Sequence, residues 1–335
     1  MRTSISRFRV VLFVGALLAA GTASAQQGAT QRLLILSKNE RMLSIVDPAT
    51  LRIVGRVPAG PDPHEVVASA DGTRAYISNY GGGTYNTLTI VDLVNQKSVG
   101  TVDLGALRGP HGLDFAGGKV WFTSEVAKVV GSYDPATSKV DLVIGTGQNG
   151  THMVYAYPDL SRLVTTNVGS GTVSIISKRE GPRADWDVIT VQAGGRVEGM
   201  DVSPDGKQIW AANAQQGTIT VIDVPSTSTK ALDAGVTGAN RLKFTPDGKL
   251  VLVSTLAGPN LTIINPADFT SEEAVKRIPV GRGAAGIQIQ PDGLRAYIAC
   301  SPDDYIAVVD LKSFQVVGRI DAGKNPDGLA WAVTR

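Results

Sequence analysis

The stretch SPDGKQIWAANAQQGTITVID, residues 203–223, decides the fold. Two runs rich in β-branched and apolar residues flank a polar turn, which predicts two antiparallel strands. The pattern recurs in six other places, one of which, AYISNYGGGTYNTLTIVD, has three extra residues in its turn. The other copies keep a small or polar residue ten positions before their closing residue: Ser37, Ser124, Asn167, Asn213, Thr255 and Cys300. Such a strict register indicates an internal repeat.

Each repeat predicts four strands. A third strand ends at glycine, as in FQVVGRIDAG, and a fourth, apolar strand runs into a turn, as in VEGMDVSPDG. Four-stranded units of 41 to 47 residues, repeated radially, predict an all-β, seven-bladed β-propeller. The C-terminal NPDGLAWAVTR supplies one innermost strand, and the N-terminal RLLILSKNERMLSIVDPATLRIVGRV supplies three more. We therefore expect these ends to close the seventh blade in a single domain, residues 26–335.

Residues 1–25 are predicted to be a signal peptide. The basic segment MRTSISRFRV is followed by the apolar run VLFVGALLAAG and by an ASA cleavage signal that ends at Ala25. We expect a periplasmic or secreted protein without a membrane anchor. The formal charge is +2, and loss of Arg2, Arg7 and Arg9 with the leader would leave −1. That balance argues against a nucleic-acid partner, and covered blade edges favour a monomer.

One position of the repeat, in the loop that enters each innermost strand, collects residues with metal-binding chemistry. We call its occupants the ring residues: His64, His111, His152, Glu198, Asn240, Ala285 and Asp327. The first four come from consecutive blades, so their side chains are expected to converge at one mouth of the channel. Three imidazoles and a carboxylate suit one divalent transition metal such as Zn²⁺, Mn²⁺ or Fe²⁺.

The segments SADGTRAYISN, LVTTNVGSGTVSIIS and SPDGKQIWAANAQQGTITVID also resemble the YVTN-repeat β-propellers. The resemblance covers the chain beyond the leader and implies the propeller fold. The family's repeat contains Pro-His-Gly, as in DPHE and GPHG here, so the histidines could be inherited without a metal. GTHM has lost the proline but kept His152. Both interpretations stay open.

Basic residues cluster beside the ring position. Arg108, Arg196, Arg282 and Lys324 precede it, and Arg241 directly follows Asn240. Guanidinium groups at a concave mouth suit a carboxylate or phosphate. Arg196, Arg241 and Arg282 are therefore candidates for binding an anionic ligand, with Asn240 and Asp327 as positioning or proton-transfer groups.

Two functions are consistent with this pattern. The first is a binding or interaction module that holds a protein partner or a small anionic ligand at the channel mouth and rim loops, with no cofactor. The alternative is a metal-dependent lyase or lactonase that acts on a carboxylate or an acidic sugar. In this alternative His64, His111, His152 and Glu198 hold the ion.

Overall fold

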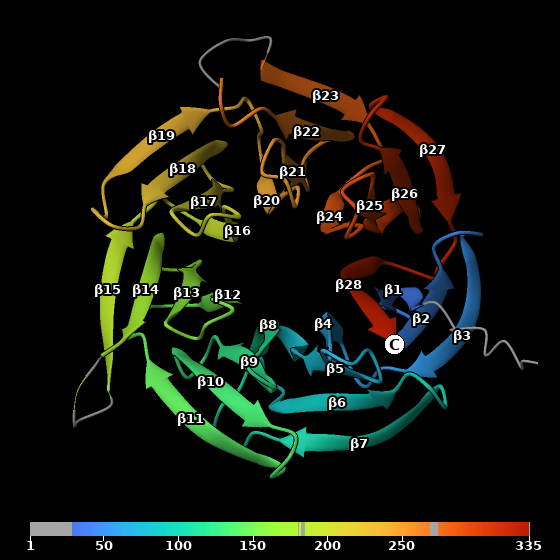
Figure 1. Ribbon diagram of the computed structural model, residues 1–335, viewed down its shortest axis with the longest axis horizontal. Helices are drawn as coiled ribbons and strands as arrows, with labels where there is room; N and C mark the ends of the chain where they lie inside the picture. Colours follow the sequence, from blue (N-terminus) through green and yellow to red (C-terminus); the bar gives the residue numbers. More distant parts are fainter. Residues whose placement is uncertain (1–28, 180, 182–184, 269–273, 335) are drawn as a thin grey trace, which may run out of the picture.

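The computed structural model describes residues 29–179, 181, 185–268 and 274–334, and the predicted leader lies outside these residues. Seven four-stranded antiparallel sheets are arranged as blades around a central channel (Figure 1). Short 3₁₀ turns occur at η1 (Gly81–Gly83) and η3 (Ser301–Asp303). Within the described ranges, no helix has the length and apolar character needed to cross a membrane. The prediction of an all-β, seven-bladed propeller is confirmed.

Blades 1 to 6 follow the chain, each from its innermost to its outermost strand. Blades 1 and 2 contain β4 (Pro63–Ala68), β5 (Arg74–Asn79), β6 (Thr87–Asp92), β7 (Lys97–Asp103), β8 (Pro110–Ala116), β9 (Lys119–Ser124), β10 (Val129–Asp134) and β11 (Lys139–Gly145). Blades 3 and 4 contain β12 (Thr151–Ala156), β13 (Arg162–Asn167), β14 (Thr172–Lys178), β15 (Trp186–Gln192), β16 (Val197–Val202), β17 (Gln208–Asn213), β18 (Thr218–Asp223) and β19 (Thr229–Asp233). Blades 5 and 6 contain β20 (Ala239–Phe244), β21 (Val251–Thr255), β22 (Asn260–Ile264), β23 (Val275–Pro279), β24 (Ala284–Ile289), β25 (Arg295–Cys300), β26 (Tyr305–Asp310) and β27 (Gln315–Ile320).

Blade 7 joins the two ends of the chain, as the strand count predicts. Its innermost strand is β28 (Pro326–Thr334), followed by β1 (Thr30–Ser37), β2 (Met42–Asp47) and β3 (Arg52–Pro58). β28 pairs antiparallel with β1, with Leu34 opposite Ala330 (Figure 1). The ring is thereby closed by hydrogen bonds between segments nearly 300 residues apart, which leaves no open sheet edge at the junction.

The core lies between neighbouring blades. Leu34 and Ile45 of blade 7, for example, pack with Val66 and Ile77 of blade 1 in one buried cluster. Middle strands such as β2 are buried along their length because a blade covers each face, whereas the outermost β3 alternates between exposed and partly buried residues. Burial of apolar surface between the blades therefore fixes their mutual position.

Glycines let the innermost strands approach one another closely around the channel. Gly112, Gly199, Gly286 and Gly328 each directly follow a ring residue. A Cβ atom at any of them would collide with the backbone of the next blade's ring residue or its neighbour. The ring residues of adjacent blades are consequently held backbone against backbone.

Candidate metal centre at the channel mouth

A β-bulge aims each ring residue of blades 1 to 6 at the channel mouth. In blade 1 the pairing of β4 with β5 shifts register between Pro63 and Val66, on either side of His64. Equivalent shifts surround the ring residues His111, His152, Glu198, Asn240 and Ala285. A bulge bends the strand and redirects the side chain that it carries. The repeated bulge explains why one sequence position faces one mouth.

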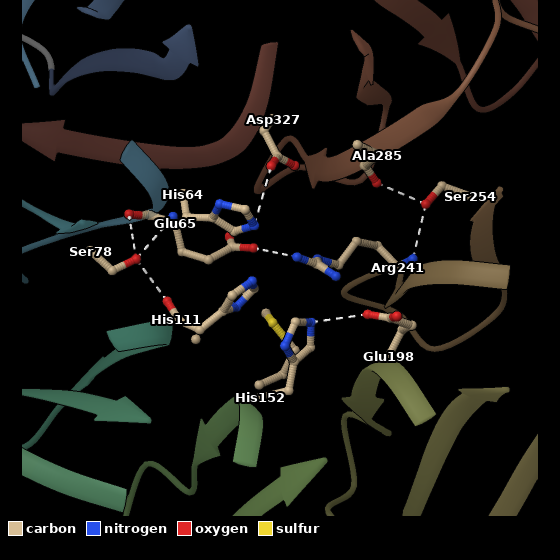
Figure 2. Close-up of polar contacts among 12 residues, drawn as sticks. His64, Glu65, Ser78, His111, His152, Glu198, Arg241, Ser254, Ala285 and Asp327 are labelled. Carbon is tan, nitrogen blue, oxygen red and sulfur yellow. Dashed lines mark hydrogen bonds and ion pairs between the residues drawn. The ribbon is translucent and has the colours of Figure 1, made fainter. Parts of the chain in front are cut away.

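A buried hydroxyl group then fixes the backbone of several ring residues. Ser78 Oγ donates to the His111 carbonyl (2.8 Å), and Thr123 Oγ1 donates to the His152 carbonyl (2.6 Å). Thr166 and Ser254 make the same bond, to Glu198 and Ala285, across the next blade boundaries. Each hydroxyl also accepts an N–H from its own blade's innermost strand, as Ser78 does from Glu65 (Figure 2). The hydroxyl groups therefore connect neighbouring blades directly beneath the site.

The ring residues line a cavity of about 580 Å³, which we call the mouth cavity. A second set of side chains completes its wall. These turn residues are the first residues after the second strand of each blade: Lys38, Tyr80, Glu125, Val168, Ala214, Leu256 and Ser301. All but Ala214 line the mouth cavity, and Ala214 lines the adjoining one. The sequence analysis did not select these residues, although six of the seven directly follow a position that the repeat alignment had singled out, and Tyr80 follows Asn79 in the copy with the longer turn.

Three side chains form a compact group that could hold a metal ion. His111, Glu125 and His152 each offer a ligand atom, and these atoms lie within 4.8 Å of one another. Glu125 Oε1 is 2.5 Å from His152 Nδ1, and Glu125 Oε2 accepts a hydrogen bond of 2.5 Å from the Tyr80 hydroxyl. The Glu125 carboxylate of blade 2 is therefore held between Tyr80 of blade 1 and His152 of blade 3.

His111 has an open ligating atom. The side chain is almost fully buried, and its Nδ1 has no hydrogen-bond partner among the described residues. Burial, together with the nearby His152 and His64, holds the pKa of His111 well below its usual value. The imidazole is consequently neutral, which is the form that binds metals.

His152 lies between two carboxylates. Its Nδ1 faces Glu125, and its Nε2 forms an ion pair with Glu198 Oε2 at 3.1 Å (Figure 2). Burial alone would lower the pKa of His152, but these two carboxylates raise it above its usual value. Burial alone would raise the pKa of Glu198, whereas the contact with His152 lowers it to about 2. Glu198 therefore adjoins the compact group as an ionised carboxylate.

His64 lies on the other side of His111 and has its own partners. The centroids of the His64 and His111 rings are 4.3 Å apart. His64 Nδ1 is 2.8 Å from Lys38 Nζ, and Nε2 is 3.7 Å from Asp327 Oδ2. Burial lowers the pKa of His64, and Asp327 opposes that shift. The structure thus gathers the four predicted metal ligands at one mouth, but it groups His111 and His152 with Glu125 and places His64 and Glu198 beside them.

The predicted anion-binding arginines differ in their surroundings. Arg241 is mostly buried and pairs with Glu65 at 2.6 Å (Figure 2). It lines both the mouth cavity and a second channel cavity of about 310 Å³. Arg196 is exposed, lines the mouth cavity and pairs with Glu198 at 2.6 Å. Arg282 instead pairs with Asp303 on the surface, outside the cavity lining. Asn240 and Asp327 line the cavity, as their ring position predicts.

The comparisons with known proteins identify the fold. No protein-family model matches the chain, and no curated protein matches it. The Kuenenia stuttgartiensis hydrazine synthase is similar in structure, with a TM-score of 0.70 at 19% identity over 83% of this chain and 92% of that chain. A candidate 6-phosphogluconolactonase from Bacteroides fragilis has a TM-score of 0.71 at 15% identity, over 92% and 99% of the two chains. Dihydro-heme d1 dehydrogenase NirN, solved in complex with DHE, has a TM-score of 0.63 at 17% identity, over 89% and 74%.

Proposed function

We propose that the protein binds one divalent transition metal through His111, Glu125 and His152, and that this centre binds and activates a small anionic ligand. The observation that carries the proposal is His111: its buried Nδ1 has no hydrogen-bond partner among the described residues, and its imidazole offers a ligand atom to a compact group with a carboxylate and a second imidazole. A buried polar atom without a partner is destabilising. A metal ion would satisfy it.

The donor set suits Zn²⁺, Mn²⁺ or Fe²⁺. Two imidazole nitrogens and one carboxylate oxygen are ligands that these ions share, and this set leaves a coordination position open for a ligand. When bound, such an ion polarises a carbonyl oxygen of the ligand. The hydrogen bond from Tyr80 would orient Glu125, and Glu198 would do the same for His152.

The charges of the mouth cavity support an anionic ligand once an ion is bound. The cations Lys38, Arg196 and Arg241 are matched by the carboxylates Glu125, Glu198 and Asp327. A divalent ion would add positive charge to this balanced lining and so favour an anion. Arg196 is exposed beside Glu198, so its guanidinium can reach a ligand carboxylate, while Asn240 offers an amide to position the ligand.

Ring opening of a small anionic lactone is the reaction that we propose for this centre. Two observations support this reaction. The mouth cavity contains a group of side chains that could hold a metal ion, and the fold is shared with candidate 6-phosphogluconolactonases. Glu198 contacts both His152 and Arg196, which suits it to hold these two side chains in place. We also propose that the protein works as a monomer after export to the periplasm or beyond.

A second candidate is the binding or interaction module without chemistry. The loops of blades 1 and 2 beside the mouth carry exposed apolar side chains, Tyr85 and Val126, and are joined by the hydrogen bond from Tyr80 to Glu125. Exposed apolar side chains on adjoining loops suit a protein partner. In this candidate the histidines would need no metal.

Metal stoichiometry separates the candidates. The mature protein, purified without a histidine tag and stripped with a chelator, would be reloaded with Zn²⁺ or Mn²⁺ and measured by calorimetry and elemental mass spectrometry. We expect about one equivalent in the wild type and in the matched control His64→Ala, and at least tenfold weaker binding in Glu125→Gln. The absence of binding in the wild type would contradict the metal site and favour the interaction module. Loss of metal binding in His64→Ala would indicate that His64 is a metal ligand, as the sequence analysis predicted.

A further inference from the structure

The turn residues divide the wall of the mouth into a polar and an apolar arc. Four of them are polar and lie on blades 6, 7, 1 and 2: Ser301, Lys38, Tyr80 and Glu125. Val168, Ala214 and Leu256, on blades 3, 4 and 5, are apolar. Because these residues occupy one repeat position, the change from polar to apolar follows the circumference of the mouth. The candidate metal centre lies at the border, with Glu125 on the polar arc and His152 on blade 3.

A side groove extends the apolar arc. A cavity of about 600 Å³ adjoins the mouth cavity between blades 4 and 5, and the two share Arg196, Glu198, Asn240 and Leu256. The groove is completed by small or neutral residues: Ala214, Gln215, Gly238 and Ala257. A ligand in the mouth cavity therefore has a continuous path outward over a surface where Arg196 and Glu198 are the charged lining groups and already pair with each other.

Leu256 is the largest apolar side chain along this path. It is 57% exposed, although it lies in a hollow where a ligand could cover it. A single exposed leucine is ordinary on a protein surface. Here it lines the side groove together with Ala214 and Ala257, and it lines the mouth cavity together with Val168, so apolar side chains lie along the path between the two cavities.

We propose that the natural ligand is amphipathic, a carboxylate whose apolar chain runs from the mouth cavity along Leu256 and Ala257 into the side groove. This inference rests on the proposed function for the anionic head group, and it narrows the substrate class. A medium-chain carboxylate or its lactone fits the surface better than a polyhydroxylated sugar acid. Where they meet Ala214, Leu256 and Ala257, the hydroxyl groups of a sugar acid would lose water without replacing its hydrogen bonds.

The test is the dependence of affinity on chain length. Calorimetry would measure acetate, butyrate, hexanoate, octanoate and gluconate against the zinc-loaded and the chelator-stripped protein. A fully buried methylene tightens binding about fourfold. For a chain in an open groove we expect roughly twofold per methylene between butyrate and octanoate, with octanoate bound more tightly than gluconate.

Two substitutions locate the chain. Leu256→Asp places a charge in the groove and should remove the dependence on chain length. Leu294→Asp is the matched control, because Leu294 is 58% exposed and lines a separate surface cavity. Both positions are exposed, so neither substitution should disturb folding. Leu294→Asp should keep the wild-type dependence of affinity on chain length.

The outcomes separate this inference from the proposed function. Affinities that do not change with chain length in the wild type, a dependence that survives in Leu256→Asp, or tighter binding of gluconate would each overturn the inference. If zinc binds stoichiometrically in such a case, the metal site stands without the groove. If zinc does not bind but Leu256→Asp abolishes a clear dependence of affinity on chain length, the result supports the groove and contradicts the metal site.

Discussion

The buried hydroxyl of Thr123 should be worth several kcal/mol to the fold. It donates to the His152 carbonyl at 2.6 Å and accepts the Gly112 N–H at 2.9 Å, and its residue is fully buried. Thr123→Val keeps the shape but deprives both backbone groups of this partner. At about 1–3 kcal/mol for each buried group left unsatisfied, the free energy of unfolding should fall by about 2–6 kcal/mol.

Urea unfolding followed by fluorescence would measure this loss. With an m-value of about 3 kcal/mol/M, a loss of 3 kcal/mol lowers the midpoint by about 1 M. Thr123→Ser is the control, because it keeps the hydroxyl and loses one methyl group, worth about 1 kcal/mol. If Thr123→Val unfolds at the same urea concentration as Thr123→Ser, the hydroxyl does not connect the blades in the way that we describe.

Three further results are expected. Gly199→Ala should lower Tm because its Cβ would collide with the Asn240 backbone, at about 1–3 kcal/mol, whereas Gly145→Ala, which points into open space, should not. The Asn95 N–H and Arg74 lower the pKa of Asp92 to about 2. The ionised Asp92 should therefore stabilise the fold fully above pH 4, and this stabilisation should disappear as the pH falls towards 2. Between pH 5 and 2, the urea midpoint should depend less on pH in Asp92→Asn than in the wild type. Zinc at 100 times its Kd should add about 2.7 kcal/mol, raising Tm by roughly 5 °C in a thermal scan of the wild type but not of His111→Ala.

The sequence was sufficient to predict the blades and their closure. A strict repeat register gives the number of blades, and an unpaired strand at the C-terminus can only complete the three unpaired strands at the N-terminus. The ring residues were also predictable, because the same repeat position must face the same mouth. Their bulges were not, since they become visible only in the pairing of β4 with β5 and its equivalents.

The partners of individual side chains were beyond the sequence. Glu125 follows Ser124 in the repeat, yet a single glutamate in a turn gives no sign that it reaches His152. Arg241 was predicted to bind an anionic ligand. In the fold its guanidinium instead pairs with a carboxylate of the same chain, Glu65, which lies 176 positions earlier. The repeat fixes where a backbone lies, and only the packed structure shows which charges meet.

The most direct test of the metal centre is anomalous diffraction at the zinc edge from crystals soaked in Zn²⁺. We predict one strong peak at the channel mouth, about 2.0–2.2 Å from a nitrogen of His111, a nitrogen of His152 and an oxygen of Glu125. No peak at the mouth, or a peak on His64 and Asp327 that leaves His111 without a ligand, would contradict the central claim.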